Sequence, residues 1–448
     1  MSHQRGGERF RNATAPGSPR STRGRRAGAR GIAILVGLLS LSTGAAAQGG
    51  QAPVAPVVDS LRLRLEDAEA AIDLLREQLG TEAEAAVRTR SRVALEWSGT
   101  VVTNVFTNTR RTNNADLPLW ARADSGTGPQ GGMGMSVRQT RLALAVGVRE
   151  VAGGTFTGDL DVDFYGGQMA SNGGRTFPLL RVRTARAVLD WANAQLLVGQ
   201  EQPLVAGLNP VSLASVGISG FSGSGNLWLW LPQVRGTVQT AGRVRLALQS
   251  AVVAPSAGEP VTPFDVAYDA AERTGRPAWE GQGRIDWGTE ARPAFVALGV
   301  HHGAVANASD VAQMQRAVTT TWRVPIGARI ELRGEAFEGQ GLRGLGGGGI
   351  YQGIGVGGRA IRTTGGWGQL NVTWSPRLLV GTGLGYDDPV DADVPTGGRL
   401  ANRVREVHVH LRPAGPLLLG LEWRDLTSTI AAGPQRNRHL NLAMGFEF

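Results

Sequence analysis

From about residue 93 to the C-terminus, apolar and polar residues alternate with a period of two. Residues 440–448 show this clearly, because every second side chain is large and apolar while those between are small or polar. Such alternation is typical of β-strands with one apolar and one polar face. About 16 segments have it, most with the roughly 9–11 residues that a tilted membrane-spanning strand needs. They lie near 93–107, 136–147, 154–164, 179–191, 194–201, 226–238, 243–252, 278–287, 293–302, 314–324, 328–337, 364–374, 377–386, 402–412, 417–427 and 437–448.

The connections between these segments alternate in length. Tight ones such as "WANA", "PIGA" and "SPR" separate eight longer ones, at 108–135, 165–178, 202–225, 253–277, 303–313, 338–363, 387–401 and 428–436. Outer-membrane barrels have short turns at one end and long loops at the other, whereas a soluble sandwich has no reason to sort its loops. The sequence therefore predicts an all-β fold, a 16-stranded antiparallel transmembrane β-barrel over 93–448, whose last strand pairs with its first.

The segment before the predicted barrel has a different spacing of apolar residues. Residues 58–80 carry apolar side chains at alternating spacings of three and four, stopped by Gly80. This heptad seam predicts a short coiled-coil helix that needs partner chains, because one narrow seam on a short helix is marginal alone. The alternative is a helix that packs on its own domain. Residues 48–57 and 81–92 are expected to be linkers, and the helix is expected to lie in the periplasm.

Residues 1–47 have the organisation of a signal peptide. Eight arginines and one glutamate precede or flank the apolar run "IAILVGLLSL", which is followed by "GAAAQ". The run is short for a membrane span, and Ala45-Ala46-Ala47 suits cleavage before Gln48. A retained membrane anchor is the alternative. Since this leader holds +7 of the formal net charge of +9, about +2 remains for the rest, and a nucleic-acid partner is not indicated.

Composition removes several kinds of chemistry. The chain has no cysteine, and all 46 basic residues are arginine. Thiol nucleophiles, cysteine-ligated zinc, disulfides, P-loop lysines and Schiff-base lysines are therefore excluded. His408 and His410 share one face of a strand, but no third ligand lies nearby, so two lumenal histidines are favoured over a metal site. No H-E-x-x-H or G-x-S-x-G motif occurs. We expect no cofactor, no metal and no enzymatic activity.

Charged residues indicate which face of each strand lines the water-filled lumen. A charge that faces mid-membrane lipid costs about 2–4 kcal/mol, so charged positions on the strands are assigned to the lumen. One strand needs a one-residue bulge near Thr184 to keep Arg186 and Asp190 out of lipid. The lumen then carries arginines beside an acidic row, and these charges either select anionic solutes or neutralise one another. The predicted pore-lining residues are Arg141, Asp159, Asp161, Asp163, Arg181, Arg183, Arg235, Arg245, Arg284, Glu331 and Arg333.

The third long connection is unusual because it has no charge. It reads "QPLVAGLNPVSLASVGISGFSGSGN" from Gln202 to Asn226. Folded into the lumen, it would form a constriction. Alternatively, it packs across the mouth of the barrel or against a neighbouring subunit.

The order of several segments resembles a known family. "SVRQTRLALAV", "GDLDVDFYG", "LLRVRTARAVLDW", "LLVGQEQP" and "PQVRG" together resemble the trimeric porins of the DcaP type and, more loosely, the phosphate-selective O/P porins. The resemblance implies a homotrimer with a periplasmic coiled coil that passes small, often negatively charged solutes. The matching pore-wall arginines would be Arg141, Arg181, Arg183 and Arg235. The absence of lysine and the uncharged loop depart from that family.

The leading hypothesis is a passive diffusion channel in the bacterial outer membrane, with outer-membrane lipid, further copies of the chain and small polar solutes as partners. The final strand, which ends on Phe448, resembles the signal that the barrel-insertion machinery reads in outer-membrane proteins. The first alternative is a structural tether whose barrel is closed by its loops. A barrel lipase or protease is a weaker alternative, because the sequence shows no Ser/His or Asp/His rim site.

Overall fold

The computed structural model describes residues 93–448 apart from 125, 127, 168–176 and 260–266. The predicted signal peptide, linkers and coiled coil over 1–92 lie outside the described residues. The strands are β1 Val93–Asn108, β2 Gly132–Ser136, β3 Arg141–Val151, β4 Gly154–Asp163, β5 Arg181–Asp190, β6 Ala194–Glu201, β7 Leu231–Gln239, β8 Arg245–Val253, β9 Ala278–Thr289, β10 Arg292–Ala306, β11 Ala312–Ile326, β12 Ile330–Gln340, β13 Arg362–Ser375, β14 Leu378–Pro389, β15 Arg399–Leu411, β16 Leu417–Ile430 and β17 Gly433–Glu447. Short helical turns lie in the connections, at η1 Leu204–Ala206, η2 Glu272–Thr274, η3 Leu342–Leu345, α3 Gly348–Tyr351, η4 Val356–Gly358 and η5 Asp391–Asp393.

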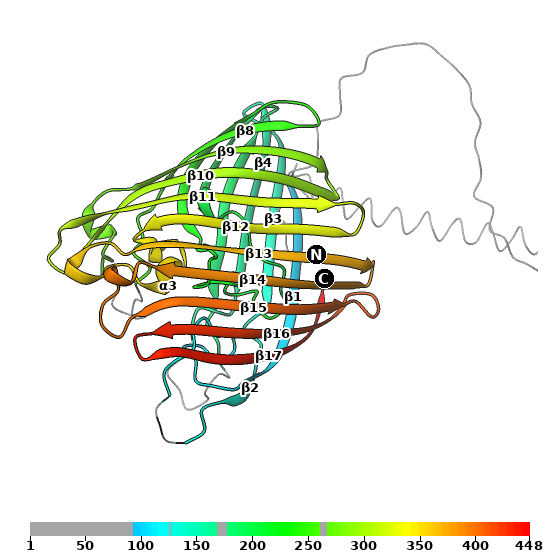
Figure 1. Cartoon of the computed structure of the whole chain (residues 1–448). Helices are drawn as coiled ribbons and strands as arrows, with labels where there is room; N and C mark the ends of the chain where they lie inside the picture. The colour runs from blue at the N-terminus through cyan, green and yellow to red at the C-terminus, as the bar shows by residue number, and fades with distance from the viewer. Residues whose placement is uncertain (1–92, 125, 127, 168–176, 260–266) are drawn as a thin grey trace, which may run out of the picture. The chain divides into compact units, whose positions relative to one another are not determined.

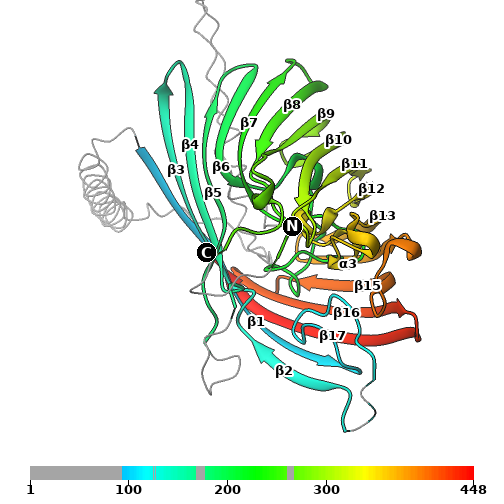
Figure 2. The same ribbon diagram turned by 90° about the vertical axis from the view of Figure 1, so that its left-hand side faces the viewer.

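The strands form one closed antiparallel barrel. From β3 to β17 each strand pairs with the next, and β17 pairs with β1, so that Thr100 lies opposite Glu447. The first half of β1 pairs with β3 and the second half with β2, so β2 and β3 occupy one position in the ring. The 17 segments thus make a 16-stranded barrel, as predicted. Figure 1 shows β8 to β17 side by side across one wall, with β3 and β4 behind, and Figure 2 shows the strands as a ring around interior segments.

Closure brings the two ends of the barrel sequence together. The backbone N–H of Gly99 donates to the carbonyl of Phe448 at 3.0 Å, and the N–H of Phe448 donates back to Gly99 at 3.1 Å. A Cβ atom on Gly99 would lie 2.7 Å from the Phe448 ring, which explains the glycine at this close approach. The last strand therefore has no free edge, because β17 pairs with β16 on one side and with β1 on the other.

The outer face is the apolar face. On β17 the side chains of Leu440, Leu442 and Met444 are 40–43% exposed, whereas the intervening Asn441 and Ala443 are 1–2% exposed. Burial alternates in the same way on β15 and β16. The predicted register is therefore confirmed for the closing strand, which has one oily face outside and one small or polar face inside.

Three boundaries differ from the sequence-based expectation. β16 and β17 extend to Ile430 and from Gly433, so the predicted long loop 428–436 is a two-residue turn. β10 and β11 likewise extend into the predicted loop 303–313. In the other direction, β7 begins at Leu231, so residues 226–230, of which 227–230 are apolar, belong to the preceding loop. Apolar side chains alone could not distinguish these cases, because a loop inside a barrel also buries its side chains.

The expected irregularity in β5 lies one residue from its predicted position. Asp161 pairs with Thr184 while the adjacent Val162 pairs with Val182, so Arg183 is the extra residue of a β-bulge. The bulge keeps Arg181, Arg183 and Arg186 all directed at β4 carboxylates. Among the described residues, no helix is long and apolar enough to cross a membrane.

Replacing Leu442 by arginine tests the assignment of the outer face. Leu442 is exposed near the middle of β17, and an arginine facing mid-membrane lipid costs about 2–4 kcal/mol. We expect Leu442→Arg to lower the free energy of unfolding in lipid vesicles by that amount, measured by urea titration of tryptophan fluorescence. Thr429→Arg, at the outer rim of β16, is the control and should cost no more than about 1 kcal/mol. Equal losses for the two variants would contradict the assignment.

Candidate functional site

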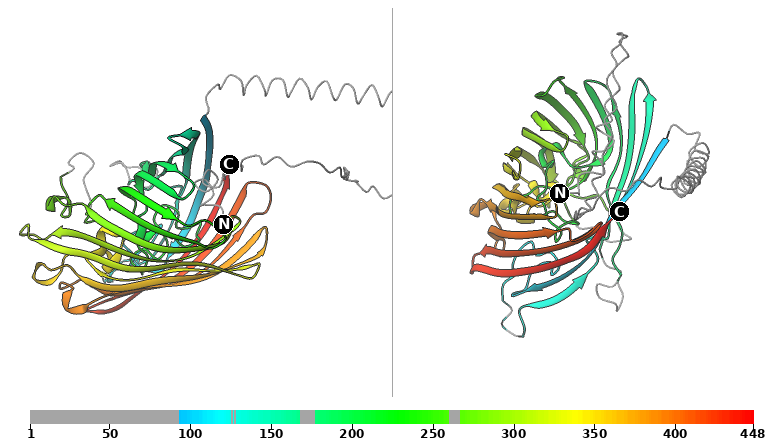
Figure 3. Two further views of the ribbon diagram at one scale, coloured as in Figure 1. Left: turned by 90° about the horizontal axis from the view of Figure 1, so that it is seen from above. Right: turned by 90° about the vertical axis from the view of Figure 1, so that its right-hand side faces the viewer.

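The connection between β6 and β7 enters the barrel and fills much of its interior. We call residues 202–230 the inner loop. Most of its side chains are buried, including Leu204, Val205, Leu208, Leu213 and Phe221. The views in Figures 2 and 3 place chain segments inside the ring of strands, and the contacts below assign the inner loop to that interior.

Small and aromatic inward-facing residues form apolar seats for the inner loop. Val205 packs with Ala251 of β8 and Ala317 of β11. Phe221 stacks on Trp367 of β13, with ring centroids 5.9 Å apart. A third cluster joins Leu213 to strands on both sides of the β1–β17 closure, through Val102, Leu418 and Ala443. The lumen is thus partly apolar, and these patches determine where the loop lies.

Polar side chains of the strands satisfy the backbone of the inner loop. Gln369 of β13 accepts from the N–H of Val211 at 2.8 Å and donates to its carbonyl at 3.0 Å. On β9, Glu280 accepts from the N–H of Leu204 at 2.6 Å. The hydroxyl of Ser212 donates to Glu422 of β16 at 2.5 Å. A buried loop carries many backbone donors and acceptors, and strand side chains supply partners that a regular ladder would otherwise provide.

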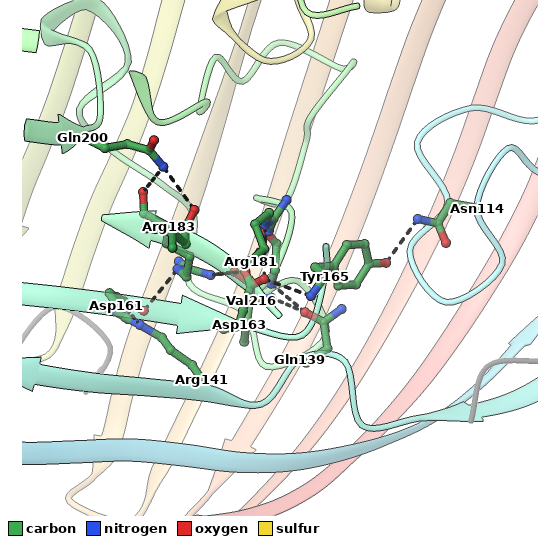
Figure 4. Close-up of polar contacts among 12 residues, drawn as sticks. Asn114, Gln139, Arg141, Asp161, Asp163, Tyr165, Arg181, Arg183, Gln200 and Val216 are labelled. Carbon is green, nitrogen blue, oxygen red and sulfur yellow. Dashed lines mark hydrogen bonds and ion pairs between the residues drawn. The ribbon is translucent and has the colours of Figure 1, made fainter. Parts of the chain in front are cut away.

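Several side chains converge on the peptide groups around Val216, as Figure 4 shows. The side-chain oxygen of Gln139 accepts from both N–H groups, at 2.9 and 2.6 Å, and its amide nitrogen donates to the carbonyl of Ala214 at 3.0 Å. The carbonyls of Val216 and Gly217 accept from Arg183 and Arg181.

Gln139 reaches the inner loop because the strand is interrupted between β2 and β3. Thr140 bonds back to the carbonyl of Val137 at 3.0 Å, which makes a turn in place of continued pairing. The hydroxyl of Thr140 then accepts from the N–H of Val102 in β1 at 3.1 Å, replacing the lost ladder bond. The interruption therefore leaves the N–H of Val102 with an acceptor, and it positions Gln139 inside the barrel.

An acidic row on β4 lies between two basic strands. Arg141 of β3 bonds Asp161. On the other side, Arg181 bonds Asp163 through two nitrogens, at 2.7 and 3.1 Å, and Arg183 reaches the same carboxylate at 3.2 Å. Asp159, the third acid, accepts from Arg186 at 2.5 Å. The alternating charges stabilise the wall and reduce its net field, since each carboxylate has a guanidinium partner.

The remaining predicted pore-lining residues lie on other strands. Glu331 of β12 is shared by Arg323 and Arg333, with nitrogen–oxygen distances of 2.8 and 2.7 Å. Arg284 of β9 bonds Asp286 at 2.6 Å and lies over the Phe295 ring. These pairs, with those of β3 to β5, bring nine of the eleven predicted residues into ion pairs.

Two predicted arginines are used differently. Arg235 of β7 donates to Gln233 and to the carbonyl of Gln202 at the start of the inner loop. Arg245 is exposed at the short-turn end of β8, opposite Asp286 in register. Arg333, beyond its ion pair, donates to the carbonyl of Asn209 at 3.0 Å. Arginines of β5, β7 and β12 therefore hold carbonyls of the uncharged loop.

Solvent reaches the arginine more than the acid in several of these pairs. The side chain of Arg141 is 22% exposed and that of Asp161 5%. For Arg181 and Asp163 the values are 24% and 0%, and for Arg284 and Asp286 they are 31% and 15%. Around these three pairs the water-accessible surface is therefore more positive than the balance of charges suggests. Three pairs have the opposite order. The values are 16% and 22% for Arg323 and Glu331, 8% and 22% for Arg333 and Glu331, and 13% and 18% for Arg186 and Asp159.

At the long-loop end, aromatic residues cover the inner loop. Tyr351 of α3 bonds the hydroxyl of Ser222, and the indole N–H of Trp228 donates to the same hydroxyl at 2.6 Å. Burial raises the pKa of Tyr351, so its hydroxyl stays neutral and serves as a hydrogen-bonding group. The guanidinium of Arg183 lies over the ring of Trp230, with its central carbon 4.5 Å from the ring centroid.

The sequence did not indicate the residues that hold the inner loop most closely. Gln369 and Glu422 belong to no motif, and Gln139 lies in the segment "SVRQTRLALAV" without being singled out there. Their polar character at inward positions was the only specific signal for them. The rings of His408 and His410 are tilted to each other with their centroids 4.9 Å apart, and His408 bonds Glu406 at 2.9 Å. Within the described part of the chain, no three His, Asp or Glu side chains are grouped to hold a metal ion.

Comparison with known proteins supports the fold. No protein-family model and no curated protein matches the chain. Among solved structures, the outer membrane channel DcaP of Acinetobacter baumannii aligns with a TM-score of 0.62 and 18% identity, over 80% of this chain and 97% of that one. An anion-selective porin from Comamonas acidovorans aligns with a TM-score of 0.53 and 13% identity, over 80% and 100%. The expected similarity to DcaP-type barrels is confirmed for the fold, which is that of outer-membrane porins.

Replacing Gln139 by alanine tests how the inner loop is held. The change leaves the buried N–H groups of Val216 and Gly217 without their acceptor, at a cost of about 1–3 kcal/mol for each. We expect Gln139→Ala to lower the melting temperature and to speed amide exchange in the loop around residue 216. Hydrogen exchange read by mass spectrometry provides the measurement. The control is Gln195→Ala. The side chain of Gln195 bonds Asp190 and does not hold residue 216, so this variant should leave the exchange unchanged.

Proposed function

We propose that this chain forms a passive diffusion channel of the bacterial outer membrane for small hydrophilic solutes, with a preference for anions. The inner loop narrows the lumen, because it packs on inward side chains of β1 and β13–β17 and also on Ala251 of β8 and Ala317 of β11. The passage then runs past the charged side chains that stay partly accessible, among them Arg141, Arg181 and Arg284.

The observation that carries the anion preference is the unequal exposure within ion pairs. A solute moving along β3 and β5 meets the guanidinium groups of Arg141 and Arg181 before their carboxylate partners. The inner loop adds no charge of its own, and it turns its carbonyls toward arginines rather than toward the solute. Because most arginines remain paired, the expected preference is modest rather than absolute.

Location, assembly and mechanism follow from the same proposal. The apolar outer face suits contact with outer-membrane lipid, and the strand that ends on Phe448 suits recognition by the barrel-insertion machinery. The heptads at 58–80 suit a homotrimer with a periplasmic coiled coil. No catalytic step is needed, since solutes move down their own gradients.

Reversal potentials in planar bilayers test the anion preference. Under a KCl gradient we expect the wild type to favour chloride over potassium, and Arg141→Gln combined with Arg284→Gln to reduce that ratio about two- to fivefold. Neither arginine bonds the inner loop in the contacts described above, so single-channel conductance should persist. Arg377→Gln, at an exposed short turn, is the control. An unselective wild type would refute the anion preference alone, and a silent bilayer would refute the channel in favour of a tethering barrel.

A further inference from the structure

A group of arginines faces outward at the long-loop end of β15 to β17. On these strands the inward residues Asn402, Glu406 and Asn437 are buried, while the arginines in alternate positions are exposed. Arg403 and Arg405 project from β15, and Arg436 and Arg438 from β17. We call these four the rim arginines. The inward charges described above line the lumen or bond the inner loop, whereas the rim arginines lie on the outer face and do neither.

The rim arginines form two rows that follow the pairing register. Arg405, Asp425 and Arg438 are consecutive cross-strand partners in one row. In the next row, Arg403 and Arg436 lie on either side of Thr427. With alternate residues roughly 7 Å apart along a strand and strands about 4.8 Å apart, the four Cα atoms mark a rectangle of about 7 by 10 Å.

The charge of this patch is not balanced. Arg436 binds Asp425 through two nitrogens, each 2.6 Å from a carboxylate oxygen. Arg403, Arg405 and Arg438 form no ion pair with any residue that the structure describes. Four cations therefore surround Asp425, and Asp388 of β14 lies beside Tyr386, the cross-strand partner of Arg403. The exposed surface keeps a net charge of +2, which calls for anionic partners.

The patch lies at the border of the apolar band. The row below it consists of Val407, Trp423 and Leu440, all 38–45% exposed and apolar, with Trp423 where an aromatic girdle is expected. Ten residues separate Arg438 from Phe448, about 33 Å along the strand, or about 25 Å across the membrane at a tilt near 40°. An outer-membrane barrel has an apolar band of about that height, so the rim arginines meet the headgroup layer of the outer leaflet.

We propose that the rim arginines bind the phosphate groups of a glycolipid in the outer leaflet. Guanidinium groups bind phosphate oxygens bidentately, and their position at the end of the apolar band lets acyl chains lie along Leu440 and Val407 below. The Thr427 hydroxyl lies between Arg403 and Arg436 and adds a donor. A free anion would gain nothing from the apolar row, which is why a lipid headgroup fits better than a soluble phosphate.

Lipid binding to the full chain in detergent micelles tests this proposal. The probe is fluorescent bisphosphorylated lipid A, with chemically dephosphorylated lipid A as the second arm. The variant combines Arg403→Gln, Arg405→Gln and Arg438→Gln, which keeps the Arg436–Asp425 pair. At about fivefold per arginine, we expect the apparent Kd for the bisphosphorylated lipid to rise about 100-fold. The wild type should bind the dephosphorylated lipid as weakly as the variant does.

A matched control removes the same charge elsewhere. Arg243→Gln, Arg329→Gln and Arg377→Gln alter three exposed arginines of the short turns and should change the Kd less than twofold. Heat-modified migration on gels confirms that both triple variants remain folded. Bilayer conductance of the rim variant should match the wild type, so a failed channel and a failed lipid site are separate results.

Three results would overturn the proposal. The first is equal binding of the two lipids by the wild type. The second is complete displacement of the lipid by millimolar inorganic phosphate, which would indicate a site for free anions. The third is a change in oligomeric mass of the rim variant with unchanged lipid binding, which would assign the patch to contacts between copies of the chain.

Discussion

The structure depends on satisfying backbone hydrogen bonds in a chain that turns an apolar face outward. Strands in such a surrounding cannot leave an edge unpaired, and pairing of β1 with β17 removes the last edge. Once the sheet is closed, every second side chain points into a confined interior. The interior then has to accommodate polar side chains, a long connection and that connection's own peptide groups.

The inner loop and the barrel wall supply hydrogen-bond partners to each other, so the buried peptide groups of the loop are satisfied by side chains of the strands. The loop has no charge, so its carbonyls and N–H groups are its polar surface. Arg181, Arg183 and Arg333 donate to those carbonyls while bonding carboxylates of neighbouring strands. The same arginines therefore stabilise the wall and hold the inner loop, and in the proposed channel they also set the potential of the lumen. Replacing one of them affects all three properties together, whereas Arg141 and Arg284 separate potential from loop attachment.

The two faces of the barrel use arginine for opposite purposes. Inside, most guanidinium groups are neutralised by carboxylates or by loop carbonyls. Outside, Arg403, Arg405 and Arg438 remain exposed beyond the apolar band, on strands that extend further than alternation predicted. Of the four rim arginines, only Arg436 lies in the part of β17 that alternation did not predict, and the extension of this strand to Gly433 places it opposite Thr427.

The sequence by itself determined the strand number, the outward face of the closing strand and the need for a bulge near Thr184. Alternation with a period of two is local, and a misplaced charge in lipid is costly, so these features are readable along the chain. The tertiary structure alone decided which polar residues hold the inner loop and which arginines stay accessible. Ser212 and Glu422 lie 210 positions apart, and Asn209 and Arg333 lie 124 apart. Such contacts depend on the curvature of the closed barrel and on apolar seats such as Ala251 and Trp367, which no short-range pattern specifies.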